Sequence, residues 1–220
     1  MKFVQVLVEG QTENEFVDVL NDYFQVKNIY LTPVIAKTKR PAKGNPAYRG
    51  GIVSFGKVEF DLQRMLQDSS TSLVTTMIDF YRLPTDFPSY HDEKAEQGSL
   101  SDRVAFLEEQ FAKIINHSKF LPYFSIHEFE ALLFTDTEKI VQEVVGENSK
   151  IAQKLQKISE QYTNPEEINL QDPPSKRILK LLKSYDKVAH GYGIAIDIGV
   201  EAMRKSCPHF NQWLTKIESI

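Results

Sequence analysis

Residues 3–16 read Phe-Val-Gln-Val-Leu-Val-Glu-Gly-Gln-Thr-Glu-Asn-Glu-Phe, and this stretch decides the fold. Residues 3–8 form a short apolar run rich in β-branched side chains, which predicts a buried strand. Gly10 ends that run, and Thr12 followed three residues later by Glu15 has the pattern of a capping box. Apolar residues then recur at helical spacing, so we expect a helix that begins after Thr12 and runs to about residue 27.

The alternation of strand and helix continues beyond this opening unit. Further strands are expected at 30–37, 72–78 and 123–126, and further helices at 58–66, 100–115 and 131–134. Pro33 lies inside the second strand, which is typical of a sheet edge or a bulge. Strands that alternate with helices predict an α/β fold with a mostly parallel sheet flanked by helices. We therefore predict an α/β core over residues 1–136.

Residues 137–220 have a different pattern, because helical periodicity dominates there apart from an interruption near 164–174. We expect a helical C-terminal portion packed on the core. Gly191-Tyr192-Gly193 is interpreted as a loop that can bring backbone close to the sheet.

The composition excludes several classes of protein. Of 220 residues, 41% are hydrophobic and 25% are charged, which is typical of a folded globular chain. Cys207 is the single cysteine, so an internal disulfide framework and a multi-cysteine zinc site are excluded. No apolar run approaches the roughly 18 residues that a membrane span needs. We expect a cytoplasmic protein without a membrane partner.

Carboxylates follow three of the predicted strands. Glu9 follows the first strand, Asp79 the third, and Glu128 with Glu130 the fourth. The carboxyl ends of parallel strands form the edge at which α/β proteins bind ligands. Glu13, four residues after Glu9, can share a face with it. Because converging carboxylates repel one another unless a cation lies between them, this pattern points to Mg²⁺ or Mn²⁺.

Basic residues are segregated from these acids, although the chain has a net charge of −4. Residues 37–64 carry seven bases and two acids, and residues 173–187 carry five bases and one acid. Such stretches favour the phosphate backbone of a nucleic acid as partner. The candidate nucleic-acid-binding residues are Lys39, Arg40, Lys43, Arg49, Arg177 and Lys187.

Two acidic motifs resemble those of the TOPRIM fold, which is found in topoisomerases, primases and overcoming-lysogenization-defect nucleases. Val8-Glu9-Gly10-Gln11-Thr12-Glu13 is similar to its opening motif, and Met77-Ile78-Asp79-Phe80-Tyr81 fits its second acidic position. Most of the chain is similar to a bacterial TOPRIM-like family whose members are often encoded beside an ABC- or AAA-type ATPase, in a setting that suggests phage defence. The motifs that carry this likeness are residues 79–88, Ile126-His127-Glu128-Phe129-Glu130-Ala131-Leu132-Leu133-Phe134, Pro174-Ser175-Lys176-Arg177 and Cys207-Pro208-His209-Phe210.

The resemblance implies a metal-dependent nuclease acting on DNA or RNA. It makes Asp79 the principal metal ligand, Glu9 a general base or ligand, and Glu13 and Glu130 supporting ligands. Lys176, Arg177 or Lys187 would neutralise the phosphate, with Lys176 the catalytic candidate. Where TOPRIM enzymes commonly have Asp-x-Asp, this chain continues Asp79-Phe80-Tyr81, so Asp86, Glu128 or Glu130 would supply the second acid.

Two other functions remain open from the sequence. One is a catalytically silent TOPRIM-like module that regulates a partner ATPase, and the other is a metal phosphohydrolase acting on nucleotides. Each of these functions is compatible with a homo-oligomer or with a complex between this chain and the ATPase. His127, the histidine beside Glu128, is more typical of a structural residue than of a ligand.

Overall fold

The computed structural model describes residues 1–36, 51–93, 98–168 and 172–220. Lys39, Arg40, Lys43 and Arg49, which the sequence nominates for nucleic-acid binding, lie outside the described residues. No helix in the described part of the chain is long and apolar enough to cross a membrane.

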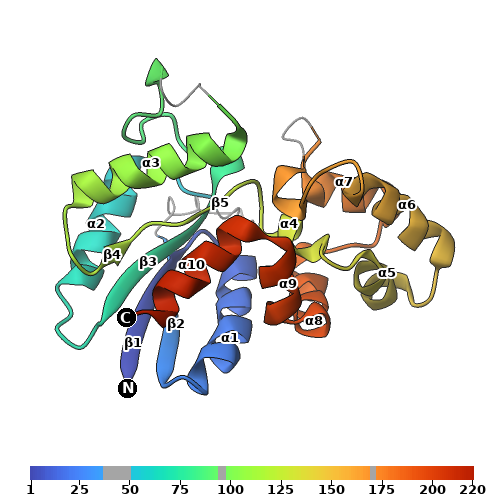
Figure 1. Cartoon of the computed structure of the whole chain (residues 1–220), viewed down its shortest axis with the longest axis horizontal. Helices are drawn as coiled ribbons and strands as arrows, with labels where there is room; N and C mark the ends of the chain where they lie inside the picture. Colours follow the sequence, from blue (N-terminus) through green and yellow to red (C-terminus); the bar gives the residue numbers. More distant parts are fainter. Residues whose placement is uncertain (37–50, 94–97, 169–171) are drawn as a thin grey trace, which may run out of the picture.

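A parallel sheet forms the centre of the fold (Figure 1). The order of its strands is β2-β1-β3-β4. β5 also pairs with β3, at Ile78 and Asp79, whereas β4 pairs with β3 at Val74 and Thr75. All of the pairings are parallel, as predicted. The strand bounds are β1 Lys2–Val8, β2 Ile29–Ile35, β3 Leu73–Asp79, β4 Phe120–Leu121 and β5 Phe124–Ser125. Pro33 lies on β2 at the edge of the sheet, where a missing backbone N–H donor costs no ladder hydrogen bond.

Helices connect the strands and cover both faces of the sheet. They are α1 Gln11–Gln25, α2 Phe55–Leu66 and α3 Leu100–Ile115. Because side chains alternate along a strand, Val4, Val6 and Val8 join a core with α1, whereas Leu7 joins a second core with α2 and α3. Every residue of β3 is buried, as expected of a central parallel strand. The predicted α/β fold is confirmed.

The rest of the chain is mostly helical, as predicted. Its elements are α4 Glu130–Leu133, α5 Thr137–Val145, α6 Ser149–Ser159, the 3-10 turn η3 Pro165–Glu167, α7 Pro174–Leu181, α8 Lys187–Ile198, α9 Val200–Ser206 and α10 Pro208–Glu218. α10 returns to the sheet near α1 (Figure 1). There the indole N–H of Trp213 donates to Thr75 Oγ1 at 2.8 Å, and its ring stacks on Tyr123 with centroids 4.2 Å apart. Residues of the sheet and of α5 to α10 share one hydrophobic core. A domain boundary at residue 136 stays a prediction.

The start of α1 differs from the expectation. Gly10 rather than Thr12 is the N-cap, and Asn14 N donates the first helical hydrogen bond to Gly10 O at 3.1 Å. Thr12 therefore lies inside the first turn, where its buried hydroxyl has no partner among the described residues. The predicted capping box is wrong because the chain turns into the helix directly after the strand, at a glycine.

The predicted loop at Gly191-Tyr192-Gly193 is also wrong, because these residues lie within α8. A Cβ atom on Gly191 would come within 3.1 Å of the Phe129 ring, and one on Gly193 within 2.7 Å of the Glu143 carboxylate. Both glycines thus allow the backbone of α8 to approach its neighbours closely. Packing, not turn formation, accounts for them.

Candidate functional site at the carboxyl edge of the sheet

The strand order reverses direction between β1 and β3, because the chain passes from β1 out to β2 and then back to β3 on the other side. In open α/β sheets the crevice beyond the carboxyl ends of two such strands is where ligands bind. Glu9 follows β1 and Asp79 ends β3, so both acids lie at this point. The backbone N–H of Asp79 donates to Glu9 Oε2 at 3.3 Å, which brings the two residues into contact.

Asp79 is buried, with 7% of its surface exposed. Its Oδ1 atom has no hydrogen-bond partner within the described chain. Burial raises the pKa of Asp79 well above its ordinary value, and the neighbouring charges of Glu13 and Glu9 raise it further. A buried carboxylate oxygen without a hydrogen-bond partner is costly unless something else satisfies it.

Glu130, at the start of α4, is fully buried. No side chain among the described residues donates a hydrogen bond to either of its carboxylate oxygens. Burial raises the pKa of Glu130 to about 7, against an opposing effect of the Lys187 charge. Glu130 also raises the pKa of Asp79, so the two acids belong to one electrostatic site.

Glu13 and Lys187 complete this acidic site, which comprises Glu9, Glu13, Asp79, Glu130 and Lys187. Glu13 is buried in the first turn of α1, and Lys187 Nζ lies 3.9 Å from its Oε1 atom. Burial opposes the charged form of Lys187, yet the charges of Glu130, Glu13 and Asp79 raise its pKa. Lys187 was predicted to bind nucleic acid. In the structure its ammonium is the counter-charge of these carboxylates.

The position of Lys187 follows from the packing of α8. Asp186 caps the helix by accepting hydrogen bonds from the backbone N–H groups of Val188 and Ala189, so Lys187 is the first helical residue. The close approach at Gly191 holds this end of α8 against Phe129 and the N-terminal turn of α1. The side chain of Lys187 remains 47% exposed and can therefore also face solvent.

Two further residues, Glu128 and Tyr185, border the acidic site. Glu128 accepts a hydrogen bond from Ser175 N at 3.2 Å, which joins the start of α7 to the sheet edge. The hydroxyl of Tyr185 is buried without a partner in the described residues; its pKa is raised by burial and by the charges of Glu130 and Glu128. Tyr185 could not be predicted as a site residue, because nothing in the sequence around it distinguishes it from a core aromatic residue.

His127 is 1% exposed, and neither ring nitrogen has a partner in the described part of the chain. Burial lowers its pKa to about 4, and the nearby Arg177 charge lowers it as well. The imidazole is therefore neutral at pH 7. Its backbone oxygen accepts from Tyr81 N at 3.3 Å, which fixes it beside the residues that follow Asp79.

Other nominated residues do not join the acidic site. Lys176 is exposed on α7. Arg177 donates from Nε to Asp172 O at 2.6 Å and from Nη2 to Tyr162 Oη at 2.8 Å, so its guanidinium braces the loop before α7. Asp86 accepts from the backbone N–H of Phe55 at the start of α2. Of the three candidates for a second acid, Glu130 is the one whose charge acts directly on Asp79.

The donor set at the acidic site fits a hard divalent cation chemically, because its acceptor atoms are carboxylate oxygens. The oxygens without partners on Asp79 and Glu130 are the atoms that such an ion would engage. Among the described residues, however, no group of three or more His, Cys, Asp or Glu side chains is arranged to hold a metal ion. The carboxylates therefore affect one another's pKa values, but in the described residues they are not arranged around one common point.

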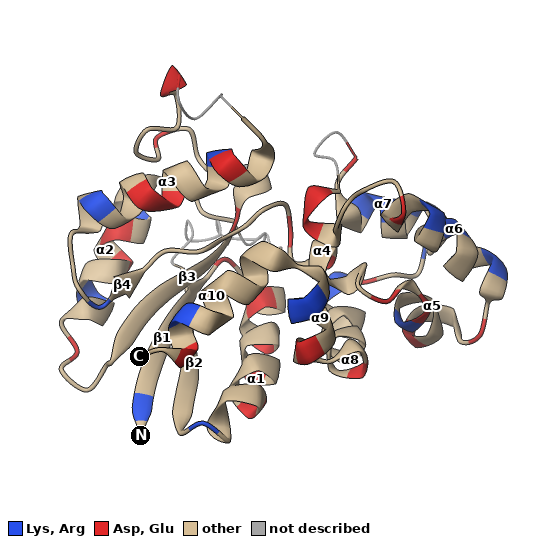
Figure 2. Ribbon diagram, in the orientation of Figure 1, with Lys and Arg blue, Asp and Glu red and all other residues tan. Residues whose placement is uncertain are grey.

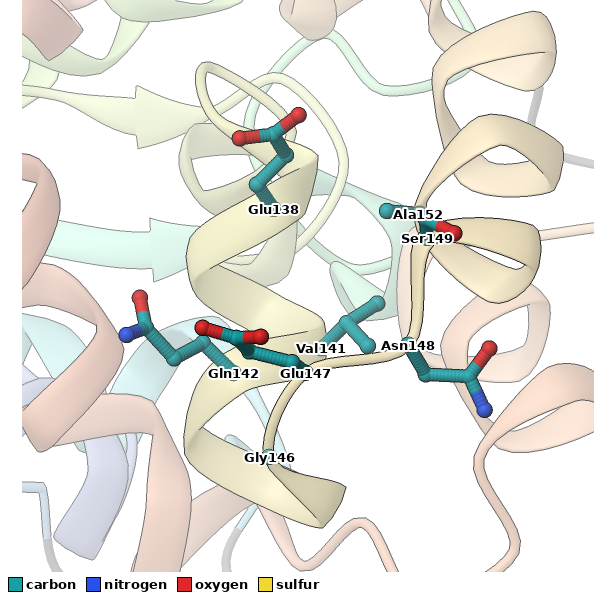
Figure 3. A pocket seen from close by; sticks show the side chains of 8 residues that line it. All are labelled: Glu138, Val141, Gln142, Gly146, Glu147, Asn148, Ser149 and Ala152. Atoms are coloured by element: carbon teal, nitrogen blue, oxygen red, sulfur yellow. The ribbon is translucent and has the colours of Figure 1, made fainter.

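A separate pocket of about 270 Å³ lies between α5 and α6 (Figure 3). Its lining includes Glu138, Glu147 and Asn148 but none of the residues nominated from the sequence. This pocket is therefore distinct from the acidic site.

Comparison with known proteins adds a family but no activity. No curated protein matches the chain. Among solved structures, the chain is similar to the C-terminal region of the OLD protein of Xanthomonas campestris pv. campestris, with 15% identity and a TM-score of 0.44 over 98% of this chain and 94% of that one. The family described as "Domain of unknown function (DUF4276)" matches residues 8–218, and the chain belongs to that family.

Proposed function

We propose that this protein is a divalent-metal-dependent nuclease of TOPRIM type, with its reaction centre at the acidic site. The observation that carries the proposal is the pair Asp79 and Glu130. Both are buried at the carboxyl edge of a parallel sheet, and both have carboxylate oxygens without hydrogen-bond partners among the described residues. Native proteins rarely leave buried polar atoms unsatisfied, so such atoms require an explanation. A bound cation is the explanation that suits carboxylates.

The electrostatics of the acidic site support the same proposal. Glu9, Glu13 and Glu130 raise the pKa of Asp79, and the charges of Glu130, Glu13 and Asp79 raise the pKa of Lys187. One or two Mg²⁺ or Mn²⁺ ions bound to these carboxylates would reduce the repulsion between them. When bound, the metal would supply Lewis-acid stabilisation of phosphate oxygens and a water of lowered pKa.

The protein's own residues have distinct roles in this proposal. Glu9 is less buried than Asp79 and Glu130, and it is therefore the acid that a water molecule reaches most readily as general base. Lys187 is half-exposed beside Glu13 and provides positive charge where a phosphate would lie. Lys176, which is exposed and directly follows Ser175 in the chain, is a second phosphate contact.

The test is cleavage of plasmid DNA, single-stranded DNA and tRNA in Mg²⁺, in Mn²⁺ and in EDTA. We expect metal-dependent cleavage that Asp79→Asn and Glu9→Gln each reduce by about a hundredfold or more. Glu147→Gln, which neutralises an exposed acid away from the acidic site, is the matched control and should cleave as wild type does. Failure of the wild-type protein to cleave in either metal, alone and with its ATPase partner, would contradict the proposal.

A specific observation favours a second candidate, a catalytically silent module that regulates an ATPase. The described carboxylates do not form a three-ligand cluster, and Lys187 already provides a counter-charge. In that case Mg²⁺ would shift the melting temperature of wild type, Asp79→Asn and Glu9→Gln equally. A nuclease instead predicts a larger shift for the wild type, because metal binding to the native state alone stabilises it.

The ATPase partner and the role in phage defence are part of the same proposal and rest on the resemblance of the motifs to the TOPRIM-like family. Co-purification of the chain with the product of the neighbouring ATPase gene tests the partnership. A metal phosphohydrolase of nucleotides would be recognised by activity on mononucleotides that changes little with salt concentration.

A further inference from the structure

One helical surface carries positive charge that the acidic site does not use. α6 and α7 together carry Lys150, Lys154, Lys157, Lys176, Arg177 and Lys180 and no acidic residue, in a chain whose net charge is −4. Figure 2 shows these basic residues along both helices. The neighbouring α5, in contrast, carries Glu138 and Glu143.

Three of these lysines form a stripe on α6, which we call the lysine stripe: Lys150, Lys154 and Lys157. Their spacing of four and three residues puts them on one side of the helix. Ala152 and Leu155 face the core instead. All three lysines are exposed, and none has a salt bridge within the described residues.

Four other lysines of the described chain form salt bridges, whereas those of the stripe form none. Lys27 bonds Glu218, Lys113 pairs with Glu109, and Lys187 lies near Glu13. Like charges three and four residues apart on a helix repel one another and destabilise it. The lysine stripe thus carries a cost in the free protein that a polyanion would remove.

The lysine stripe is connected to the acidic site through α7. Ser175, in the first turn of α7, donates its backbone N–H to Glu128 at the sheet edge, and α6 packs against α7. Lys176 and Lys180 lie on the same side of α7, one turn apart, and Lys180 pairs with Asp172. A strand bound at the acidic site can therefore continue along α7 onto α6.

We propose that the lysine stripe, with Lys176 of α7, is a docking surface for the phosphodiester backbone of a nucleic acid that enters the acidic site. Lys150 and Lys157 are about 10 Å apart along the helix axis, which matches about three successive phosphates of one strand. Contacts of this kind position the substrate and carry no sequence information. The proposal rests on the proposed nuclease function only in assigning the bound nucleic acid as the substrate that is cleaved.

The experiment measures binding without cleavage, by fluorescence anisotropy of labelled 30-base-pair duplex DNA and duplex RNA in EDTA at several salt concentrations. The test variant is Lys150→Gln/Lys154→Gln/Lys157→Gln. The matched control, Lys113→Gln/Lys205→Gln/Lys216→Gln, removes the same charge from α3, α9 and α10. Melting temperatures of all three proteins confirm that both variants fold.

We expect the stripe variant to bind at least about tenfold more weakly at low salt, irrespective of base sequence. Its slope of log affinity against log salt should fall by about two to three, since each phosphate contact contributes about one. The slope of the control variant should lie closer to the wild-type slope than the slope of the stripe variant does. The duplex that binds more tightly identifies the preferred nucleic acid as DNA or RNA.

Equal affinities and slopes for the wild type and the stripe variant would overturn the inference, as would a wild-type protein that binds neither duplex. These outcomes are separable from the nuclease proposal. Weaker binding by the stripe variant without any metal-dependent cleavage by the wild type would support the docking surface and refute the nuclease. Equal binding and equally efficient cleavage by the wild type and the stripe variant would refute the docking surface and support the nuclease.

Discussion

Glu130 and Glu166 are both buried glutamates, with exposed fractions of 0% and 4%, yet their surroundings differ completely. Glu166 accepts hydrogen bonds from the backbone N–H groups of His209 and Phe210, at 2.8 and 2.9 Å. Those amides belong to the first turn of α10, which otherwise has no side-chain cap. Glu130 has no such donors from other residues in the described chain.

The comparison distinguishes two reasons to bury a carboxylate. Glu166 satisfies a helix N-terminus and interacts favourably with its dipole, so its burial stabilises the fold. Glu130 and Asp79 provide acceptor oxygens that no described side chain satisfies, so their burial opposes the stability of the metal-free protein. A carboxylate that the fold does not need is one that a ligand can use.

The largest effect should come from removing the Glu166 carboxylate. Glu166→Ala leaves two backbone N–H groups of α10 without acceptors in a buried position, and we expect a loss of about 2–3 kcal/mol in the free energy of unfolding. Urea denaturation measures this loss. Glu166→Gln keeps one acceptor oxygen and should lose less. If Glu166→Ala leaves the free energy of unfolding unchanged, Glu166 does not stabilise the fold and the contrast with Glu130 fails.

Neutralising an acid of the acidic site should have the opposite sign. Without metal at pH 8, Glu130→Gln and Asp79→Asn should each raise the free energy of unfolding by about 1–2 kcal/mol, because each removes a buried like charge. Mg²⁺ should then stabilise each variant less than it stabilises the wild type. Urea denaturation in EDTA and in Mg²⁺ tests both statements. If both variants are less stable than the wild type in EDTA, Glu130 and Asp79 stabilise the fold and the expectation is wrong.

Burial raises the pKa of both glutamates, Glu130 and Glu166, and the pH dependence of stability can be tested most directly for Glu130. The pKa of Glu130 in the folded state is about 7, above its ordinary value of 4.5, so the folded protein binds a proton that the unfolded chain has already lost. Stability should therefore fall as pH rises from about 4.5 to about 7, by on the order of 2 kcal/mol for this group. The difference between Glu130→Gln and wild type, measured in EDTA, should be near zero at pH 4.5 and largest above pH 7. A difference that does not change with pH would contradict the assignment.

The smallest effect should come from Lys187. Its side chain is 47% exposed, so solvent screens its attraction to the carboxylates. Lys187→Gln should lower the free energy of unfolding in EDTA by less than about 1 kcal/mol at pH 7 and raise the apparent pKa of Glu130. Calorimetric melting across pH measures both. Lys183→Gln, which changes an exposed lysine four residues before Lys187, should change neither quantity.

Much of the fold was predictable from the sequence. The apolar runs of β1 and β3 and the helical periodicity of α3 are local patterns, and they placed these elements within one or two residues of their bounds. The parallel order also followed, because strands separated by helices must cross over. Glu9 and Asp79 could be assigned to one edge for the same reason.

Tertiary packing decided the rest. The sequence could not reveal that Gly191 lies against Phe129, because a glycine that allows close helix packing is locally indistinguishable from one in a loop. For the same reason it could not identify Lys187 as the partner of Glu13, more than 170 residues earlier in the chain. Nor could it separate Glu130 from Glu166, since the difference between them lies in backbone groups of His209 and Phe210, which are distant in the chain. Local periodicity fixes which elements form, whereas long-range contacts determine which buried charges the fold satisfies and which it leaves open.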